Sequence, residues 1–521
     1  MDFRKAIIVV TVITAAIMEL IDVSIVNVGL SQISGNLGAT IEDTAWVITA
    51  YAIANVIIIP MTGFLARYFG RKNYYLTSIF IFTISSWVCG NAPDLATLII
   101  ARFFQGIGGG ALLSTSQSIL FDTFDPPKRP MASALFGMGI VVGPTIGPIL
   151  GGHIIDNYSW PLIFTINIPI GLLAAFLTYT FVEKKPEELN IDRKSIKIDY
   201  PGILLLAAGV GALQYVLEKG TSEDWFDSNV IIACAAIAAI GLIGFIVWEF
   251  ITDTPVIDLR ILKERNLAAS NILTFVVGFG LFGSVFIFPV LVQRVMGYTP
   301  TDAGMGLVPG ALVAIFVMPI IGRSLQGGVP PLVFVVMGFV FFFLHGYTAA
   351  QATPDVGNSF FIIPQIFRGL GTAMLTVPLI NQSVVGLAPQ QLPYAVSMTN
   401  MIRQVGGAFG IAIMNTYVNT RYWVHRTDLL SNLDATDPEL TQRLNQTAAG
   451  MIASGINPLQ ANEAALRAID GAVTKQSYMQ AYLDGFLLIS LFFVIASSFI
   501  LMLKTKKSDA ATMKKVAESA H

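Results

Sequence analysis

The sequence carries little charge for its length. Of its 521 residues only 12% are charged while 54% are hydrophobic, and the mean hydropathy is +0.68. Soluble domains carry about 25% charged residues, so roughly half of the usual charge is missing. This deficit excludes an ordinary soluble enzyme, and the high hydrophobicity excludes a disordered chain. The formal net charge of −2 lacks the basic excess that phosphate neutralisation needs, which excludes a nucleic-acid partner.

Cysteine and histidine are also scarce. The two cysteines, Cys89 and Cys234, lie in apolar runs, so neither a disulfide framework nor a paired-thiol metal site is expected. The four histidines form no zinc-binding helix motif, and the chain contains neither a nucleophile elbow nor a Gly-Lys-Ser/Thr phosphate loop. No metal, no cofactor and no ATP-driven transport are therefore expected. A membrane-embedded enzyme is the disfavoured alternative of a different class.

What the sequence has instead is long apolar runs. A helix needs about 20 mostly apolar residues to span a bilayer, and barrel strands would be about ten residues long with polar alternation. The sequence predicts an all-α membrane protein with 14 spans, at about 6–30, 45–66, 74–92, 96–120, 132–154, 161–182, 199–217, 229–251, 268–293, 303–322, 330–350, 360–382, 396–418 and 480–503.

The distribution of Lys and Arg predicts the orientation of these spans. Placing the N-terminus in the cytoplasm puts 21 of the 31 Lys and Arg residues on the cytoplasmic side, seven outside and three within spans. Basic residues concentrate in cytoplasmic loops. Both termini are therefore predicted to be cytoplasmic, in a lipid bilayer that the chain crosses an even number of times.

An internal repeat divides the chain into two halves. Gly106 and Gly108 correspond to Gly369 and Gly371 at an offset of 263, and Pro60 corresponds to Pro319 at an offset of 259. Repeats of this kind are common in transporters. The predicted units are an N-terminal six-helix bundle (1–185), two inserted spans with flanking loops (186–265), a C-terminal six-helix bundle (266–503) with an external helical hairpin at about 420–479, and a cytoplasmic tail (504–521).

Glycine motifs mark predicted close helix contacts. Two glycines four residues apart give a flat helix face, and prolines bend the helix. Such a face is typical of a helix against which the other half of a transporter rocks. The alternative is that the glycines only form a static packing contact between helices. The candidate packing and gating residues are Gly63, Gly70, Arg71, Gly106, Gly139, Gly143, Pro144, Gly147, Pro148 and Gly151.

Ionisable residues within spans are candidates for function because a charge is costly to bury in lipid. Glu19 and Asp22 share one helix face. Asp22 lies about 24 Å along the first span and Arg102 about 9 Å from the outer end of the fourth, so their depths coincide in a core of about 30 Å. We therefore expect an Asp22–Arg102 pair, with proton coupling as the favoured role and a structural ion pair as the alternative. Asp22 is the predicted proton carrier, and Glu19 the second candidate.

Three further features are less specific. Arg368, Arg403 and Asn400 form a possible second-half polar site or a structural brace. Phe275, Phe279, Phe282 and Phe286 recur at helical spacing and would suit a cavity for lipophilic or cationic substrates, although such a stripe also suits lipid or core. Two Pro-initiated helix starts, Asp437-Pro438 and Asn457-Pro458, predict the external hairpin, which either docks a partner or caps the outer vestibule.

Together these motifs resemble the major facilitator superfamily, in particular its fourteen-spanner drug:proton antiporters (EmrB/QacA-like). Gly63–Lys72 resembles the family's loop motif, Arg102-x-x-Gln105-Gly106 its fourth-span motif, and Gly139–Gly152 the antiporter signature. One departure is Arg67, where the family usually has an acidic residue.

The resemblance implies a function and partners. It implies export of hydrophobic or cationic drugs by alternating access across the bacterial cytoplasmic (inner) membrane, driven by protons. It leaves open a periplasmic adaptor and an outer-membrane channel as partners. A dedicated exporter of a metabolite such as a siderophore or a fatty acid is the alternative.

Overall fold

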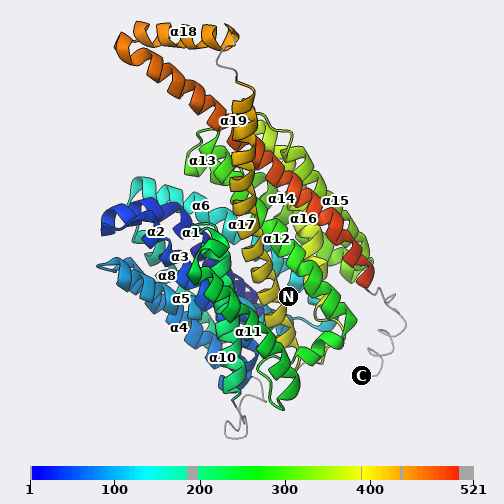
Figure 1. Ribbon diagram of the computed structural model, residues 1–521. Coiled ribbons are helices and arrows are strands. Elements are labelled where there is room, and N and C mark those ends of the chain that lie inside the picture. Colours follow the sequence, from blue (N-terminus) through cyan, green and yellow to red (C-terminus); the bar gives the residue numbers. More distant parts are fainter. Residues whose placement is uncertain (1–2, 185–197, 389, 434–437, 504–521) are drawn as a thin grey trace.

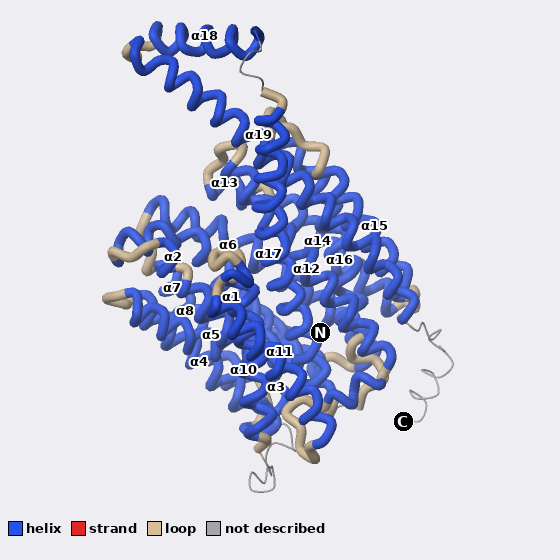
Figure 2. The backbone as a smooth tube through the Cα atoms, in the orientation of Figure 1, coloured by secondary structure: helices blue, strands red, loops and turns tan. Residues whose placement is uncertain are grey.

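The computed structural model describes residues 3–184, 198–388, 390–433 and 438–503, and these residues form helices with no strand. The predicted boundary at 185/186, the tail 504–521 and Asp437 lie outside the described residues. The helices run lengthwise through the molecule (Figure 2). The all-helical prediction is confirmed.

The first part of the chain forms one group of helices. Its elements are α1 (Phe3–Leu37), α2 (Ile41–Thr44), α3 (Trp46–Phe69), α4 (Arg71–Gly90), α5 (Leu95–Thr123), η1 (Pro126–Lys128), α6 (Arg129–Asn157), α7 (Leu162–Thr165) and α8 (Asn167–Phe181). The next elements are α10 (Tyr200–Lys219), η2 (Trp225–Asp227), α11 (Asn229–Ile251) and η3 (Leu259–Lys263).

The last part of the chain forms a second group. Its elements are α12 (Arg265–Arg294), α13 (Pro300–Met305), α14 (Val308–Gln326), α15 (Pro331–Ala349), η4 (Asn358–Phe361), α16 (Ile362–Gln382), α17 (Leu392–Ser431), α18 (Pro438–Ala453), α19 (Pro458–Ala496) and η5 (Ser497–Met502). Helix α18 and the first part of α19 project beyond the rest of the molecule (Figure 1). From there α19 runs towards the opposite end, at which α1 begins and η5 ends. We call these ends the hairpin face and the terminal face.

Twelve helical segments in the described residues are long and apolar enough to cross a membrane. The other two predicted spans, 74–92 and 396–418, fall on α4 and α17, which have 20 and 40 residues but are more polar. The prediction of 14 spans therefore fits the helices, with twelve meeting the criterion of length and composition.

The internal repeat is visible in helix packing. A Cβ on Gly106 of α5 would collide with the backbone of Tyr51 on α3, and a Cβ on Gly369 of α16 would collide with the backbone of Gly310 on α14. Each pair of helices therefore crosses at a distance that only glycine permits. The same crossing therefore occurs once in each half, at the glycines that the offset of 263 had paired.

The inserted helices α10 and α11 pack on each other through Gly209 and Gly241. Helix α10 also contacts α3 from the first half and α17 from the second. Leu206 and Phe245 join Phe64 and Met398 in one apolar cluster. Helix α11 is the least buried of the candidate spans. This arrangement supports, as a proposal, the division into two bundles with a peripheral inserted pair.

The glycine repeat of α6 predicts a measurable effect on stability. A Cβ at Gly143 would collide with Leu20 Cβ and lie 3.1 Å from the backbone carbon of Leu20, whereas Gly471 on α19 has nothing within 4 Å. Replacing Gly by Ala in a helix gains about 1 kcal/mol of intrinsic propensity, but overpacking costs about 1–3 kcal/mol. We expect Gly143→Ala to lower the thermal unfolding midpoint of the purified protein in detergent. Gly471→Ala, the matched control, should leave the midpoint unchanged or raise it.

Candidate buried charge site

Asp22 lies at the centre of a buried polar cluster in the first half. Its Oδ2 accepts a hydrogen bond from Arg102 Nη1 at 2.5 Å, so the pairing expected from the depths of the two residues is confirmed. Its Oδ1 accepts from Gln105 Nε2 at 2.8 Å and from Asn167 Nδ2 at 2.7 Å. Asp22 is 0% and Arg102 1% exposed. Both carboxylate oxygens therefore face donors.

The Arg102 guanidinium makes further contacts besides its bond to Asp22. Its Nε donates to the carbonyl of Val47 at 3.1 Å, and its Nη1 also donates to Gln105 Oε1 at 2.7 Å. The guanidinium lies 4.1 Å from the ring centre of Tyr51. Burial of an ion pair is tolerated only with such geometry and additional hydrogen bonds. The cluster is therefore built to keep both charges in place.

Glu19 is buried nearby but has a different environment. Its Oε1 accepts from Asn55 Nδ2 at 3.0 Å and from Tyr51 OH at 3.3 Å. Its Oε2 has no hydrogen-bond partner, and the side chain is 2% exposed. In the part of the chain that the structure describes, Glu19 makes no ion pair. A buried carboxylate oxygen without a donor is costly, unless that oxygen carries a proton.

Two of the second-half polar residues are hydrogen-bonded to each other and to the first half. Arg403 on α17 donates from Nη2 to Asn400 Oδ1 at 2.6 Å, and both are buried. Asn400 Nδ2 in turn donates to Gln117 Oε1 at 2.9 Å and to Ser114 Oγ at 3.2 Å, both on α5. A polar network therefore joins the two halves.

Arg368, the third of these residues, lies elsewhere in the second half. At the offset of 263, Arg102 corresponds to Gln365 and Gln105 to Arg368, so the two residue types are exchanged. Arg368 is 4% exposed and donates from Nη2 to the carbonyl of Leu307 at 3.3 Å. Among the described residues it makes no ion pair. The structure does not bring Arg368 and Arg403 into one site.

The glycine motifs form packing contacts, as predicted, and the regularly spaced glycines of α6 contact a helix of the same half. A Cβ at Gly143, Gly147 or Gly151 would collide with α1, at Leu20, Ser24 and Ile25 respectively. Gly139 faces the same helix, and Pro144 and Pro148 lie within α6. The repeat of four residues therefore makes a seam inside the first half. Gly137 and Gly152, off this face, approach Met318 and Thr301 of the second half.

The loop motif between α3 and α4 has three structural roles. Gly70 has a φ of 83°, which only glycine adopts easily, and it separates the two helices. Gly63 packs against Tyr394 of α17 in the second half. Arg71 forms an ion pair with Asp122 at the end of α5.

The phenylalanines of α12 are divided between core and partly exposed positions. Phe279 is 2% exposed and lies 4.0 Å from Phe492, measured between ring centres. Phe275, Phe282 and Phe286 are half-buried.

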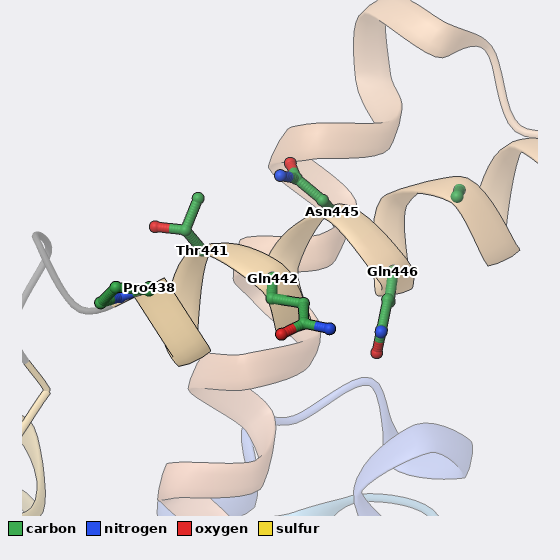
Figure 3. A pocket seen from close by; sticks show the side chains of 6 residues that line it. Pro438, Thr441, Gln442, Asn445 and Gln446 are labelled. Atoms are coloured by element: carbon green, nitrogen blue, oxygen red, sulfur yellow. The ribbon is translucent and has the colours of Figure 1, made fainter.

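A shallow pocket lies on α18, far from these phenylalanines. It is lined by Pro438, Thr441, Gln442, Asn445, Gln446 and Ala449 (Figure 3).

The two halves are closed against each other at the terminal face. One apolar cluster combines Val9, Val12 and Phe121 of the first half with Ile380, Leu392 and Val396 of the second. Gln326 Nε2 also donates to the carbonyl of Lys128 at 3.4 Å. Towards the hairpin face, by contrast, the large clusters are confined to one half each, and the halves meet where Thr301 of α13 approaches Asp156 of α6.

The sequence identified the charges but missed most of their partners. Asn167, Tyr51 and Asn55 are ordinary polar residues of apolar spans, and nothing in their spacing marks them as partners of Asp22 or Glu19. Gln105 was visible only as part of the fourth-span motif. No group of three His, Cys, Asp or Glu suited to a metal ion occurs within the described ranges.

The fold and this buried charge site are those of a membrane transporter rather than of a soluble protein. Residues 12–411 match the Major Facilitator Superfamily. The chain belongs to this family.

The chain is similar to curated proteins over most of its length. It is 36% identical to the multidrug export protein EmrB of Haemophilus influenzae, over 81% of this chain and 82% of that one. It is 36% identical to EmrB of Escherichia coli, over 83% and 84%. It is 34% identical to the fatty acid resistance protein FarB of Neisseria gonorrhoeae, over 92% of both chains.

Solved structures show the same fold at low sequence identity. A bacterial homolog of the human lysosomal transporter Spinster aligns with a TM-score of 0.56 at 14% identity, covering 96% of this chain and 97% of that one. The human organic anion transporter MFSD10 aligns with a TM-score of 0.56 at 13% identity, covering 94% and 99%.

The ion pair itself predicts a non-additive effect on stability. Removing one partner of a buried pair leaves an uncompensated charge and costs about 3–5 kcal/mol. We expect Arg102→Met to destabilise the protein strongly in detergent. Adding Asp22→Asn should recover part of the loss, because the amide still accepts from Gln105 or Asn167. A thermal double-mutant cycle measures this coupling. Additive losses would show that the two charges do not depend on each other.

Proposed function

We propose that this protein is a secondary exporter that moves lipophilic compounds, including cations, out of the bacterial cytoplasm in exchange for protons. Glu19, Asp22 and Arg102 form the proposed proton-coupling site. The observation that carries the proposal is two buried acids within one turn of α1 in a transporter fold, since ionisable groups at this depth are costly unless they serve transport. The relatives named as multidrug export proteins support the substrate class.

The proposed topology follows from the basic residues. The terminal face is cytoplasmic, the hairpin face is periplasmic, and the protein lies in the inner membrane. We assign it no enzymatic activity, because transport by this site requires proton and substrate movement but no covalent chemistry.

Export of a fatty acid is the second candidate. The similarity to FarB covers more of the chain than the similarity to either EmrB protein. The buried cations Arg368 and Arg403 would suit a carboxylate group. Competition decides between the two candidates: a fatty acid that displaces a lipophilic cation during transport shares its path, and a fatty acid that is transported alone indicates a dedicated exporter.

The exchange itself is testable in inside-out membrane vesicles. We expect a fluorescent lipophilic cation to accumulate when protons are pumped into the lumen, and the accumulation to collapse with a protonophore. Asp22→Asn should abolish proton-driven accumulation, since the variant leaves Arg102 without its counterion. The control is Asp253→Asn, which changes an exposed acid. Accumulation by Asp22→Asn at the wild-type rate would remove Asp22 from the coupling site.

The external hairpin is the proposed docking site for a periplasmic adaptor and, through it, an outer-membrane channel. Its base is fixed: Arg421 Nε donates to Asp484 Oδ2 at 2.5 Å, and Arg426 Nη2 to Asp470 Oδ1 at 2.5 Å. These carboxylates raise the pKa of both arginines above the ordinary value. Beyond this base, Leu459 is 91% exposed. An ordered extension with exposed apolar side chains fits a protein partner.

Removing the tip of the hairpin separates docking from transport. We expect a chain in which a short Gly/Ser linker replaces 433–463 to lose efflux from intact cells but to transport normally in reconstituted vesicles. The deletion leaves the paired arginines and aspartates in place, so the second half should remain folded. Loss of transport in both settings would make the hairpin part of the transport unit.

A further inference from the structure

The loop between the two inserted helices has an unusual backbone. It spans 220–228, and we call it the Trp225 loop. Asp224 and Trp225 have φ angles of 52° and 54°, and they are the non-glycine residues with positive φ in the part of the chain that the structure describes. A bulky side chain rarely adopts this conformation. Such strain persists only where surrounding contacts impose it, so the contacts of the loop indicate its role.

The Trp225 side chain reaches from this loop to the second half. The backbone N–H of Trp225 donates to the carbonyl of Gly220 at 2.7 Å, and a Cβ on Gly220 would lie 2.7 Å from the indole. The indole Nε1 donates to Thr416 Oγ1 on α17 at 3.1 Å, and Thr221 Oγ1 lies 2.9 Å from the same oxygen. Two side chains of the strained loop therefore converge on one hydroxyl group of α17.

The same end of α10 is attached to the first half by larger contacts. Lys219 is 8% exposed, and its Nζ donates to the carbonyl of Glu42 on α2 at 3.4 Å. This ammonium group also lies 5.3 Å from the ring centre of Trp46 on α3. Further along α10, a Cβ on Gly211 would lie 3.2 Å from Ile57 Cδ1 of α3. The inserted helices are thus packed on the first half over several turns.

The two attachments differ in how easily they separate. The contact with the first half combines a buried cation, an aromatic ring and packed apolar side chains, which lose favourable burial when they part. The contact with Thr416 consists of neutral hydrogen bonds between half-buried groups, and water can replace such bonds at little cost. A loop bound to both halves must release one of them when the halves move. The Thr416 contact is the weaker one.

We propose that the two inserted helices are a strap that moves with the first half, and that the Trp225 loop binds Thr416 while the terminal face is closed and releases it when that face opens. The proposal rests on the proposed transport function, because it requires the halves to move. In the structure the terminal face is closed and Trp225 is bonded to Thr416. A contact that is present in only one state shifts the equilibrium towards that state. The strap therefore stabilises the closed terminal face.

A reversible disulfide tests whether the contact must open. Because the two hydroxyl oxygens are 2.9 Å apart, Thr221→Cys and Thr416→Cys place two sulfur atoms within reach of an S–S bond of about 2.05 Å. Full-length protein that also carries Cys89→Ser and Cys234→Ser is oxidised in inside-out vesicles, and the loss of free thiols confirms the bond. We expect oxidation to lower proton-driven uptake of a lipophilic cation at least about tenfold, because a locked contact removes one state of the cycle. A reductant should restore uptake.

A second disulfide is the matched control. Gly211→Cys with Ile57→Cys joins α10 to α3 in the same background, and these helices should move together. Uptake should therefore be equal in the oxidised and reduced forms of this control. Inhibition by the bond to α3, together with normal uptake when Thr221→Cys is bonded to Thr416→Cys, would show that the inserted helices move with the second half.

A labelling experiment measures opening of the terminal face without any substrate. Thr376 is 5% exposed and lies against Gly137 across the junction of the halves, so a cysteine there should react only when this face opens. The reporter is Thr376→Cys in full-length protein with Cys89→Ser and Cys234→Ser, in lipid nanodiscs. The probe is a hydrophilic maleimide.

Breaking the contact should speed this labelling. Trp225→Phe removes the indole donor and keeps a ring, and Thr416→Val removes the hydroxyl group. We expect each change to raise the labelling rate about threefold or more, as the loss of one or two neutral hydrogen bonds predicts. Thr420→Val is the matched control, because Thr420 lies one turn further along α17 and its hydroxyl donates within that helix. This control should label at the rate of the parent protein.

Two results would overturn the inference. One is unchanged uptake after the bond between Thr221→Cys and Thr416→Cys has formed, and the other is labelling of Trp225→Phe and Thr416→Val at the rate of the control. If the reduced double-cysteine protein is itself inactive, the labelling rates decide. Failure of the proposed transport function looks different, because the wild type would then take up no cation while the labelling comparison, which uses no substrate, still supports or overturns the strap.

Discussion

The first half depends on one buried interaction, the Asp22–Arg102 ion pair. Removing two charges from water costs several kcal/mol per ion even after relaxation, and only complete hydrogen bonding offsets that cost. The carboxylate and guanidinium together draw a backbone carbonyl from α3, a side chain from α5 and one from α8 towards α1. The relative positions of four helices are thus fixed around one acid. The glycine seam between α1 and α6 then brings α6 against the opposite side.

The second half repeats the helix crossings but not the charge. At the offsets of 259 and 263 the counterparts of Asp22 are Leu281 and Val285, both apolar. The second half keeps one buried arginine, Arg368, but at the position that corresponds to Gln105 rather than to Arg102. Among the described residues, Arg368 forms no ion pair with an acid. The two halves are therefore electrostatically unequal: the first holds buried acids, and the second presents buried cations.

The sequence predicted those features that depend on one helix at a time. Hydropathy located the helices, and depth along two spans was enough to pair Asp22 with Arg102. The rotation of a helix about its axis depends on all its neighbours, so the sequence could not show that Asn167 and Gln105 face Asp22 or that Asn400 crosses to Gln117. For the same reason the spacing of Gly143 and Gly147 predicted a close helix contact but did not identify α1 as the partner, and the phenylalanine stripe did not reveal that Phe279 lies in the core.

A transporter that exchanges one ion for a substrate must prevent the empty, ionised carrier from reorienting, since that step would let either gradient run down. A charge pair within one half cannot do this, because it moves as a unit and is equal in both states. An attraction across the two halves can do it, provided that a proton or a cation can cancel it. The structure holds Asp22 in a complete set of hydrogen bonds, whereas Glu19, one helical turn away, has one carboxylate oxygen without a donor. The bonds of Asp22 fix the helices that position Glu19, so the two acids need not share one role.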